Sequence, residues 1–140
     1  MRRFERVGSP PVPRIIPTDP FWLPSPDAFD AIGSALRRHP SIAFIDPGAP
    51  FTAIGCPACG AAIAEGWWRE RLAAGYDAER EAYEVLTVAP PCCERLVSLN
   101  DLAYEPPAGF ARVEVVAGAG DLARVAAVLG HPVRAISARR

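Results

Sequence analysis

Hydrophobic positions follow the same order at both ends of the chain: a strand pattern, a helical pattern and a second strand pattern. In the first third, the apolar segment 12–17 precedes Phe29, Ile32 and Leu36, which recur at helical spacing, and the apolar run 42–45 follows them. These periods predict a strand, a helix and a strand in the first third of the chain.

Prolines and polar residues define where these first elements begin and end. The tripeptide 25–27 (Ser-Pro-Asp) is typical of a helix N-terminus, with a capping hydroxyl, a first-turn proline and an acid that complements the helix dipole. We expect this helix to end at 37–39, because Pro40 cannot continue it. The prolines of segment 12–17 confine that strand to the edge of a sheet or to strand ends.

The last third carries a clearer version of the pattern. Segment 111–116 alternates between apolar and polar residues, as a half-buried strand does. Asp121 predicts the cap of a helix that Gly130 ends, and an apolar strand follows at 133–138. One face of this helix is apolar at helical spacing, formed by Leu122, Val125, Ala126 and Leu129.

The middle of the chain predicts a helix preceded by a strand. The strand covers 51–55 and the helix 62–75, on which the adjacent Trp67 and Trp68 cannot both face the core. The charged segment 76–84 is either an extension of this helix or a solvated loop, and its charge favours the solvated loop.

Two further strands are predicted on either side of the second cysteine pair, Cys92 and Cys93. Segments 85–89 and 95–99 are expected to form a hairpin, followed by a turn at 100–101 and a loop over 102–110. The four cysteines of the chain lie in two close pairs, at Cys56-Pro57-Ala58-Cys59-Gly60 and at Pro91-Cys92-Cys93. In a reducing compartment, two such pairs indicate a metal site more often than disulfides, and two disulfides in an exported protein remain the alternative.

The residue types and their spacing predict one structural zinc site with Cys56, Cys59, Cys92 and Cys93 as ligands. Neighbouring Cys92 and Cys93 can both reach one ion only if the chain turns there. Otherwise one of them is a core thiol, and another side chain completes the site. The candidates for that replacement are His39, His131 and Glu94, and iron is the alternative metal.

The two β-α-β halves predict one four-stranded antiparallel sheet with both helices on one face, the split βαβ or ferredoxin-like arrangement. We therefore expect a single α+β domain over 14–140, with a zinc-ribbon unit inserted at about 51–104 and a flexible arm at 1–13. The alternative is a five- or six-stranded α+β sheet continuous with the ribbon.

Composition and charge exclude some classes of function. Half of the 140 residues are hydrophobic, and the net charge of −1 gives no global positive field for nucleic acid or an anionic membrane. No apolar run approaches the roughly 20 residues that a membrane span needs, and prolines follow the basic start where a signal peptide would be apolar. We therefore expect a cytoplasmic protein, and the use of Arg without any Lys suggests a GC-rich bacterial genome.

Five motifs occur along the chain, namely CPxCG at 56–60, a Trp pair at 67–68, PCC at 91–93, SLNDLxY at 98–104 and PxGFAR at 107–112. Taken together, these motifs resemble those of a family of small bacterial zinc-ribbon proteins, many of them actinobacterial. The resemblance covers most of residues 14–138 and implies cysteine-bound zinc, without implying an activity. Glu94 departs from the family pattern, in which a glycine often follows the two cysteines.

Three hypotheses about function follow. The first is a non-catalytic zinc-stabilised module that binds another protein, as an immunity or adaptor protein does. Under this hypothesis we expect no enzymatic activity and no small-molecule substrate. The sequence lacks phosphate-loop, nucleophile-elbow and metalloprotease motifs. The second is a zinc ribbon that binds nucleic acid, and the third is a thiol-dependent redox protein. The second requires that the arginines share one face, namely Arg37, Arg38, Arg69, Arg71, Arg134, Arg139 and Arg140.

Overall fold

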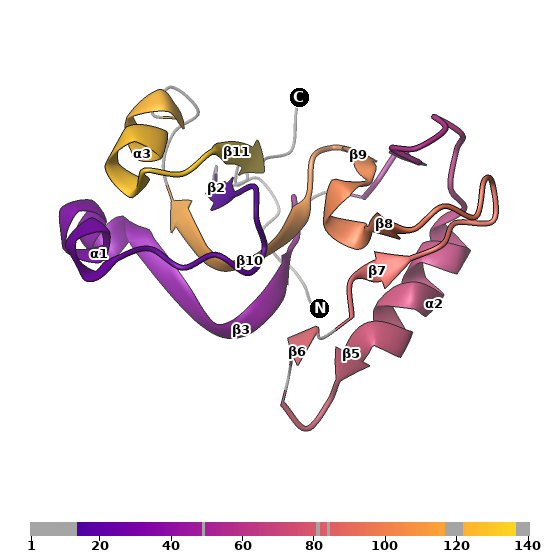
Figure 1. Cartoon of the computed structure of the whole chain (residues 1–140), viewed down its shortest axis with the longest axis horizontal. Helices are drawn as coiled ribbons and strands as arrows, with labels where there is room; N and C mark the ends of the chain where they lie inside the picture. The colour runs from indigo at the N-terminus through magenta and orange to yellow at the C-terminus, as the bar shows by residue number, and fades with distance from the viewer. Residues whose placement is uncertain (1–13, 49, 81, 84, 117–121, 137–140) are drawn as a thin grey trace.

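A computed structural model of the chain describes an α+β structure, as the sequence predicts. A four-stranded antiparallel sheet with two helices lies on one side, and a middle segment of small hairpins with a third helix lies on the other (Figure 1). The predictions for 1–13, for the helix cap at Asp121, for the strand end at 137–138 and for Arg139 and Arg140 concern residues outside the described ranges. Those ranges are 14–48, 50–80, 82–83, 85–116 and 122–136.

The two terminal thirds of the chain form the sheet. Its strands lie in the order β11-β2-β10-β3, and every neighbouring pair is antiparallel. Each third runs strand, helix, strand. The elements in chain order are β2 (Arg14–Pro17), α1 (Pro26–Ile32), β3 (Leu36–Ile45), β10 (Gly109–Val116), α3 (Leu122–Leu129) and β11 (Val133–Ile136).

Helices α1 and α3 lie side by side against one face of the sheet (Figure 1). Ser25 caps α1, because its hydroxyl accepts a hydrogen bond from the Ala28 N–H at 3.3 Å. Gly130 ends α3 with a φ of 70°. None of the helices in the described ranges is long and apolar enough to cross a membrane. The core beneath α1 and α3 is formed by Ile15, Ala28, Val115, Val125 and Leu129.

The first helix is shorter than predicted, and the strand after it is longer. α1 ends at Ile32 and is capped by Gly33, whose φ of 74° is accessible to glycine at little cost. β3 then begins at Leu36, and residues 37–38, expected in the last helical turn, pair with β10 instead. Pro40 is tolerated inside β3 because β3 is an edge strand and its register with β10 shifts at this point.

Strand β2 lies inside the sheet, between β10 and β11, so of the two positions that its prolines allow, an edge and a strand end, the edge does not apply. Its described proline, Pro17, is the last residue of the strand, opposite Val133. A proline at a strand end interrupts no interior ladder bond, which is the other position that the sequence allowed.

The segment between β3 and β10 forms helix α2 (Glu65–Gly75) and three two-stranded sheets. The predicted hairpin around the second cysteine pair is present. Residues 76–77 and 82–83 pair as two strands where a helical extension or a solvated loop was expected, and 103–105 is a strand rather than part of a loop. The pairs are β4 (Ala53–Gly55) with β9 (Ala103–Glu105), β5 (Tyr76–Asp77) with β6 (Ala82–Tyr83), and β7 (Thr87–Val88) with β8 (Val97–Ser98).

The hydrophobic core of this middle segment is continuous with the sheet. Trp68 of α2 is 2% exposed, its ring meets that of Phe44 at 5.6 Å between centroids, and its indole N–H donates to the Tyr104 hydroxyl at 2.9 Å. Phe44 pairs across β3 and β10 with Phe110, with ring centroids 5.2 Å apart. Trp67 is half-buried, as expected for one of two adjacent tryptophans.

A second connection between the middle segment and the sheet is polar and centres on Asn100, which is 1% exposed. Its side-chain amide donates to the Thr18 carbonyl at 3.0 Å, and its Oδ1 accepts from the Phe110 N–H at 2.7 Å. The Arg134 guanidinium of β11 donates to the Asn100 carbonyl and to Oδ1, each at 2.7 Å. The sequence indicated only a turn at 100–101, so this role was missed.

Gly109→Ala is expected to lower the free energy of unfolding by about 1–3 kcal/mol through overpacking. A Cβ there would meet the Arg134 guanidinium and would lie 2.8 Å from Ile16 Cδ1 and 3.0 Å from Asn100 Oδ1. Gly66→Ala in α2 is the matched control, because its Cβ would meet nothing within 4 Å and alanine favours a helix by roughly 0.5–1 kcal/mol. Urea denaturation should give shifts of opposite sign, and a stabilising Gly109→Ala would contradict the close packing at this position.

Candidate metal centre

The first two cysteines lie on the turn that follows β4. The Cys56 carbonyl accepts from the Gly60 N–H at 2.8 Å, and the Cys56 N–H donates to the Ala61 carbonyl at 2.9 Å. Gly60 has a φ of 81°, a conformation that residues with a Cβ rarely adopt. This tight turn brings the Cys59 thiol back toward the Cys56 thiol.

The second turn has the same geometry with different residues. The Pro90 carbonyl accepts from the N–H groups of Cys93 at 3.4 Å and Glu94 at 2.7 Å. Glu94 has a φ of 60°, so it occupies the position that Gly60 holds in the first turn. The chain therefore turns at Cys92 and Cys93, which is the condition under which both thiols can reach one ion.

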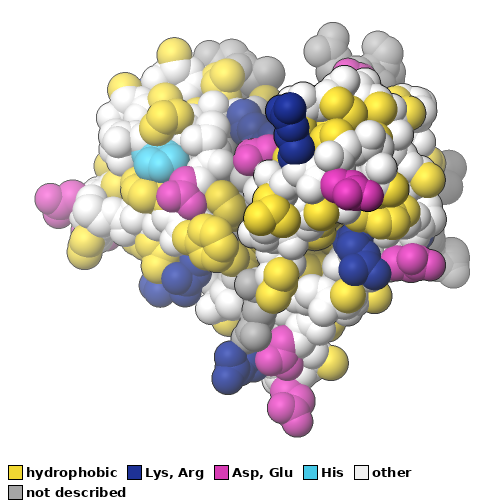
Figure 2. Space-filling view, turned by 45° about the vertical axis from the view of Figure 1, so that its right-hand side comes forward, with side chains coloured by type: hydrophobic (Ala, Val, Ile, Leu, Met, Phe, Trp, Pro, Cys, Tyr) yellow, Lys and Arg dark blue, Asp and Glu magenta, His cyan; other side chains and the backbone are white. Residues whose placement is uncertain are grey.

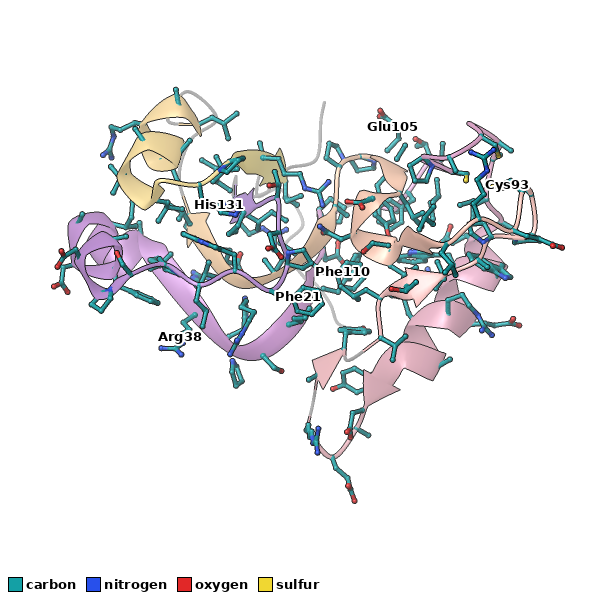
Figure 3. The ribbon with its side chains drawn as sticks, in the orientation of Figure 1. Phe21, Arg38, Cys93, Glu105, Phe110 and His131 are labelled. Carbon is teal, nitrogen blue, oxygen red and sulfur yellow. The ribbon has the colours of Figure 1, made fainter. Side chains whose placement is uncertain are left out.

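The four sulfur atoms form one cluster. Cys56 Sγ is 3.8 Å from Cys93 Sγ, Cys59 Sγ is 3.3 Å from Cys92 Sγ, and all four lie within 4.8 Å of one another. All four thiols are free, so the alternative of two disulfides does not describe this structure. Cys56 is buried and Cys93 half-buried, whereas Cys59 and Cys92 are exposed. The cluster therefore lies at the surface, at the end of the middle segment far from helices α1 and α3 (Figure 3), and it could hold a metal ion.

Electrostatics within the cluster favour a bound cation. Burial raises the pKa of Cys56, but the N–H groups of Cys59 and Ala58 and the neighbouring thiols donate to its sulfur and lower the pKa to about 7. The hydrogen bond with Cys59, together with burial and the nearby thiols, raises the pKa of Cys92 to about 12. One thiolate is therefore stabilised, while like charges oppose further deprotonation. A divalent cation would offset that repulsion.

Metal affinity is expected to rise with pH. In the metal-free chain the pKa of Cys56 is about 7 and that of Cys92 about 12, and the pKa of Cys93 is also raised. Metal binding near pH 8 must therefore displace at least two protons, those of Cys92 and Cys93, so the logarithm of the affinity should rise by about two or more per pH unit. Below pH 7 the Cys56 thiol is also protonated, and the slope should increase by about one more. Competition with a chromophoric chelator measures this slope, and a flat profile would exclude the thiols as ligands.

Neither histidine joins the sulfur cluster. His39 Nε2 lies 2.7 Å from a carboxylate oxygen of Glu114, and the His131 ring stacks on Trp22 with centroids 4.3 Å apart. Glu94 contributes its backbone conformation to the second turn. Across the described ranges, the four cysteines are the one group of three or more possible ligands that the structure brings together.

Glu114 is a buried carboxylate that the sequence pattern did not indicate. The alternation of 111–116 predicts an exposed side chain, but Glu114 is 5% exposed and bonded to His39, and Arg14 Nη1 lies 3.8 Å from its second oxygen. His39 was expected at the end of a helix, so no sequence signal placed its side chain beside Glu114 of the neighbouring strand β10.

Glu94→Gly is expected to stabilise the metal-free chain by about 1 kcal/mol. A left-handed backbone costs a residue with a Cβ about 1–2 kcal/mol, and glycine avoids that cost. Part of the gain is lost because glycine also increases the conformational entropy of the unfolded chain. Glu94→Ala is the control, since alanine keeps the strained φ of 60°. Thermal unfolding in a chelator compares the variants. Equal midpoints for the glycine and alanine variants would contradict backbone strain as the cause.

Comparison with protein families, curated proteins and solved structures gave no match for this chain. The chemistry of the site therefore rests on the geometry and electrostatics of the four thiols.

Proposed function

We propose that the metal is zinc and that it holds the middle segment together. Zinc–sulfur bonds of about 2.3 Å in a tetrahedron place the sulfurs about 3.8 Å apart. The distances of 3.3 and 3.8 Å in the cluster are close to that value. Four thiolates leave no coordination position for water or substrate, so the role is structural. Elemental analysis of the purified chain distinguishes zinc from iron.

The proposed fold is the split βαβ arrangement with an inserted zinc ribbon. The sheet order β11-β2-β10-β3 supports it, because the first and third sheet strands in the chain lie at the centre and each half contributes one helix. The hairpin β7–β8 supports the ribbon, because the second cysteine pair lies on the connection between its strands.

The proposed function is a non-catalytic module that binds another protein, in the manner of an immunity or adaptor protein. The observation that carries it is Leu96, which is 75% exposed on the segment between the second cysteine turn and β8. Val85, at the other end of the same hairpin, is 57% exposed. The metal would fix the hairpin that presents these apolar side chains to a partner.

Leu96→Asp tests this function. Tagged wild-type and variant chains are expressed in the native host, and captured proteins are identified by mass spectrometry. Phe21→Asp is the matched control, because Phe21 is also exposed, at 59%, but lies outside the hairpin. We expect a partner that is captured by wild type and by Phe21→Asp and lost with Leu96→Asp, and that retrieves the chain when it is tagged in turn. Equal capture by all three would contradict the role of Leu96.

No described feature favours nucleic-acid binding over this proposal. Arg134 is held by Asn100, and Arg69 pairs with Glu65 at 2.6 Å. On the face shown in Figure 2, basic and acidic side chains are interspersed. A nucleic-acid surface instead gathers its basic side chains.

A further inference from the structure

A groove about 440 Å³ in volume lies between the sheet and the β5–β6 hairpin. Four parts of the chain line it: the loop after β2, strand β3, the hairpin and strand β10. Figure 3 shows Phe21, from the first of these parts, near the middle of the molecule between the sheet and the middle segment. The lining residues are Phe21, Pro40, Ser41, Ile42, Arg80, Ala82, Tyr83 and Arg112.

Two side chains that line this groove each carry a buried polar atom with no hydrogen-bond partner in the described part of the chain. Arg112 Nε and Ser41 Oγ are both buried, and neither makes a hydrogen bond. A buried donor left unpaired costs about 1–3 kcal/mol, so native structures rarely keep one without a reason. Two such groups from neighbouring strands in one groove indicate that an external acceptor completes them.

The charge of the groove identifies that acceptor as an anion. Arg112 and Arg80 bring two guanidinium groups, and none of the described residues that line the groove is acidic. Arg80 has Asp77 as a partner, at 3.7 Å between Nε and Oδ2, whereas Asp77 does not line the groove. A carboxylate or phosphate oxygen is the acceptor that a guanidinium N–H binds most strongly.

The remaining walls are apolar, and they define the rest of the ligand. Phe21 is 59% exposed, and Pro40, Ile42 and Tyr83 also face the groove. The exposed Phe21 ring is a stacking surface for a planar group. A volume of about 440 Å³ falls in the usual range of roughly 300–1,000 Å³ for small-molecule sites.

We propose that this groove binds a small organic anion in which a carboxylate or phosphate is attached to a planar ring. The oxyanion accepts hydrogen bonds from Arg112 Nε and Ser41 Oγ, and the ring packs on Phe21. The site is separate from the sulfur cluster and adds a ligand-binding activity to the proposed protein-binding function. It needs no chemical step, because the groove presents no activated nucleophile.

Titration of the full zinc-loaded chain by NMR tests the proposal with two anions, adenosine 5′-monophosphate and phenylacetate. Adenosine and phenylacetamide are the neutral counterparts. We expect at least one anion to bind with an affinity of about 1 mM or better and its neutral counterpart about 10-fold more weakly. The Nε–H signal of Arg112 should shift on binding. Whichever anion binds tells a carboxylate ligand from a phosphate ligand.

Two substitutions locate the binding. Arg112→Gln and Ser41→Ala should each weaken the anion about 10-fold or more, as expected for loss of one charge-assisted or buried hydrogen bond. Arg38→Gln is the matched control, because Arg38 lies on the same strand as Ser41 but lines a different hollow, beside α1. If Arg112→Gln fails to fold, Arg112→Lys, which keeps the charge and lacks Nε, takes its place.

The proposal is overturned if neither anion binds the wild-type chain at millimolar concentration, or if binding leaves the Arg112 Nε–H signal unmoved. It is also overturned if Arg112→Gln and Arg38→Gln weaken anion binding by the same factor, because anion affinity would then depend only on the overall charge of the protein.

Discussion

Cys56→Ser is expected to abolish stoichiometric zinc binding and to unfold segment 51–104. Metal binding by four thiolates contributes on the order of 10 kcal/mol in small zinc modules. A domain of this size keeps only about 5–15 kcal/mol of net stability. The loss should also reach the sheet, because the core of the middle segment includes Phe110 of β10. Circular dichroism, thermal unfolding and elemental analysis measure the three effects.

The control for this substitution is Ala62→Ser, which adds the same hydroxyl at an exposed position after the first cysteine turn. A second readout uses Trp22→Phe, which leaves Trp67 and Trp68 of α2 as the fluorescent residues. Chelation of the metal should shift their emission to longer wavelength as buried Trp68 becomes exposed. A chain that is purified without metal, and whose unfolding midpoint is unchanged by Cys56→Ser, would contradict the structural role.

The apolar periods of the sequence were sufficient to place the strands and helices of the two terminal thirds, because each of these elements has one face against a common core. They were insufficient at 36–40, where the pattern predicted the end of a helix before Pro40 and the structure has the start of strand β3. There, Gly33 ends the helix and pairing with β10 decides the structure. Such a choice depends on a partner strand more than 60 residues away in the sequence, which no local pattern records.

Motif spacing was sufficient to predict one cluster of four cysteines, because each turn holds its own two thiols close together and four sulfurs complete one tetrahedral metal site. The polar connections could not be found in this way. Asn100 and Glu114 look like a turn residue and an exposed strand residue, and each acquires its partners only when distant strands meet. Arg112 Nε and Ser41 Oγ are of the same kind, since only the folded structure shows that neither atom has a hydrogen-bond partner among the described residues.

Asn100→Ala is expected to lower the free energy of unfolding by about 3–5 kcal/mol. The substitution leaves the Phe110 N–H and the Thr18 carbonyl without partners and removes one of the two acceptors of Arg134. Each buried group left unpaired costs about 1–3 kcal/mol. Arg134 adds to the loss, because burial lowers the pKa of its guanidinium, which shows that the charge is poorly hydrated.

Two variants separate this polar connection from a general effect of substitution. Ser98→Ala removes only the hydroxyl that accepts from the Asn100 N–H at 3.1 Å, and it should cost about 1 kcal/mol. Asn100→Asp keeps the acceptor for Phe110 and Arg134 and loses only the donor to Thr18, so its cost should lie between the other two. Urea denaturation at fixed zinc concentration gives the three free energies.

Amide exchange at Phe110 is a second readout of this connection. Asn100 joins Arg134 of strand β11, Thr18 after strand β2 and the Phe110 N–H of strand β10. Asn100→Ala should therefore also speed amide exchange at Phe110, whose N–H loses its acceptor. An exchange rate as slow as that of the wild type would show that apolar packing alone holds the middle segment on the sheet.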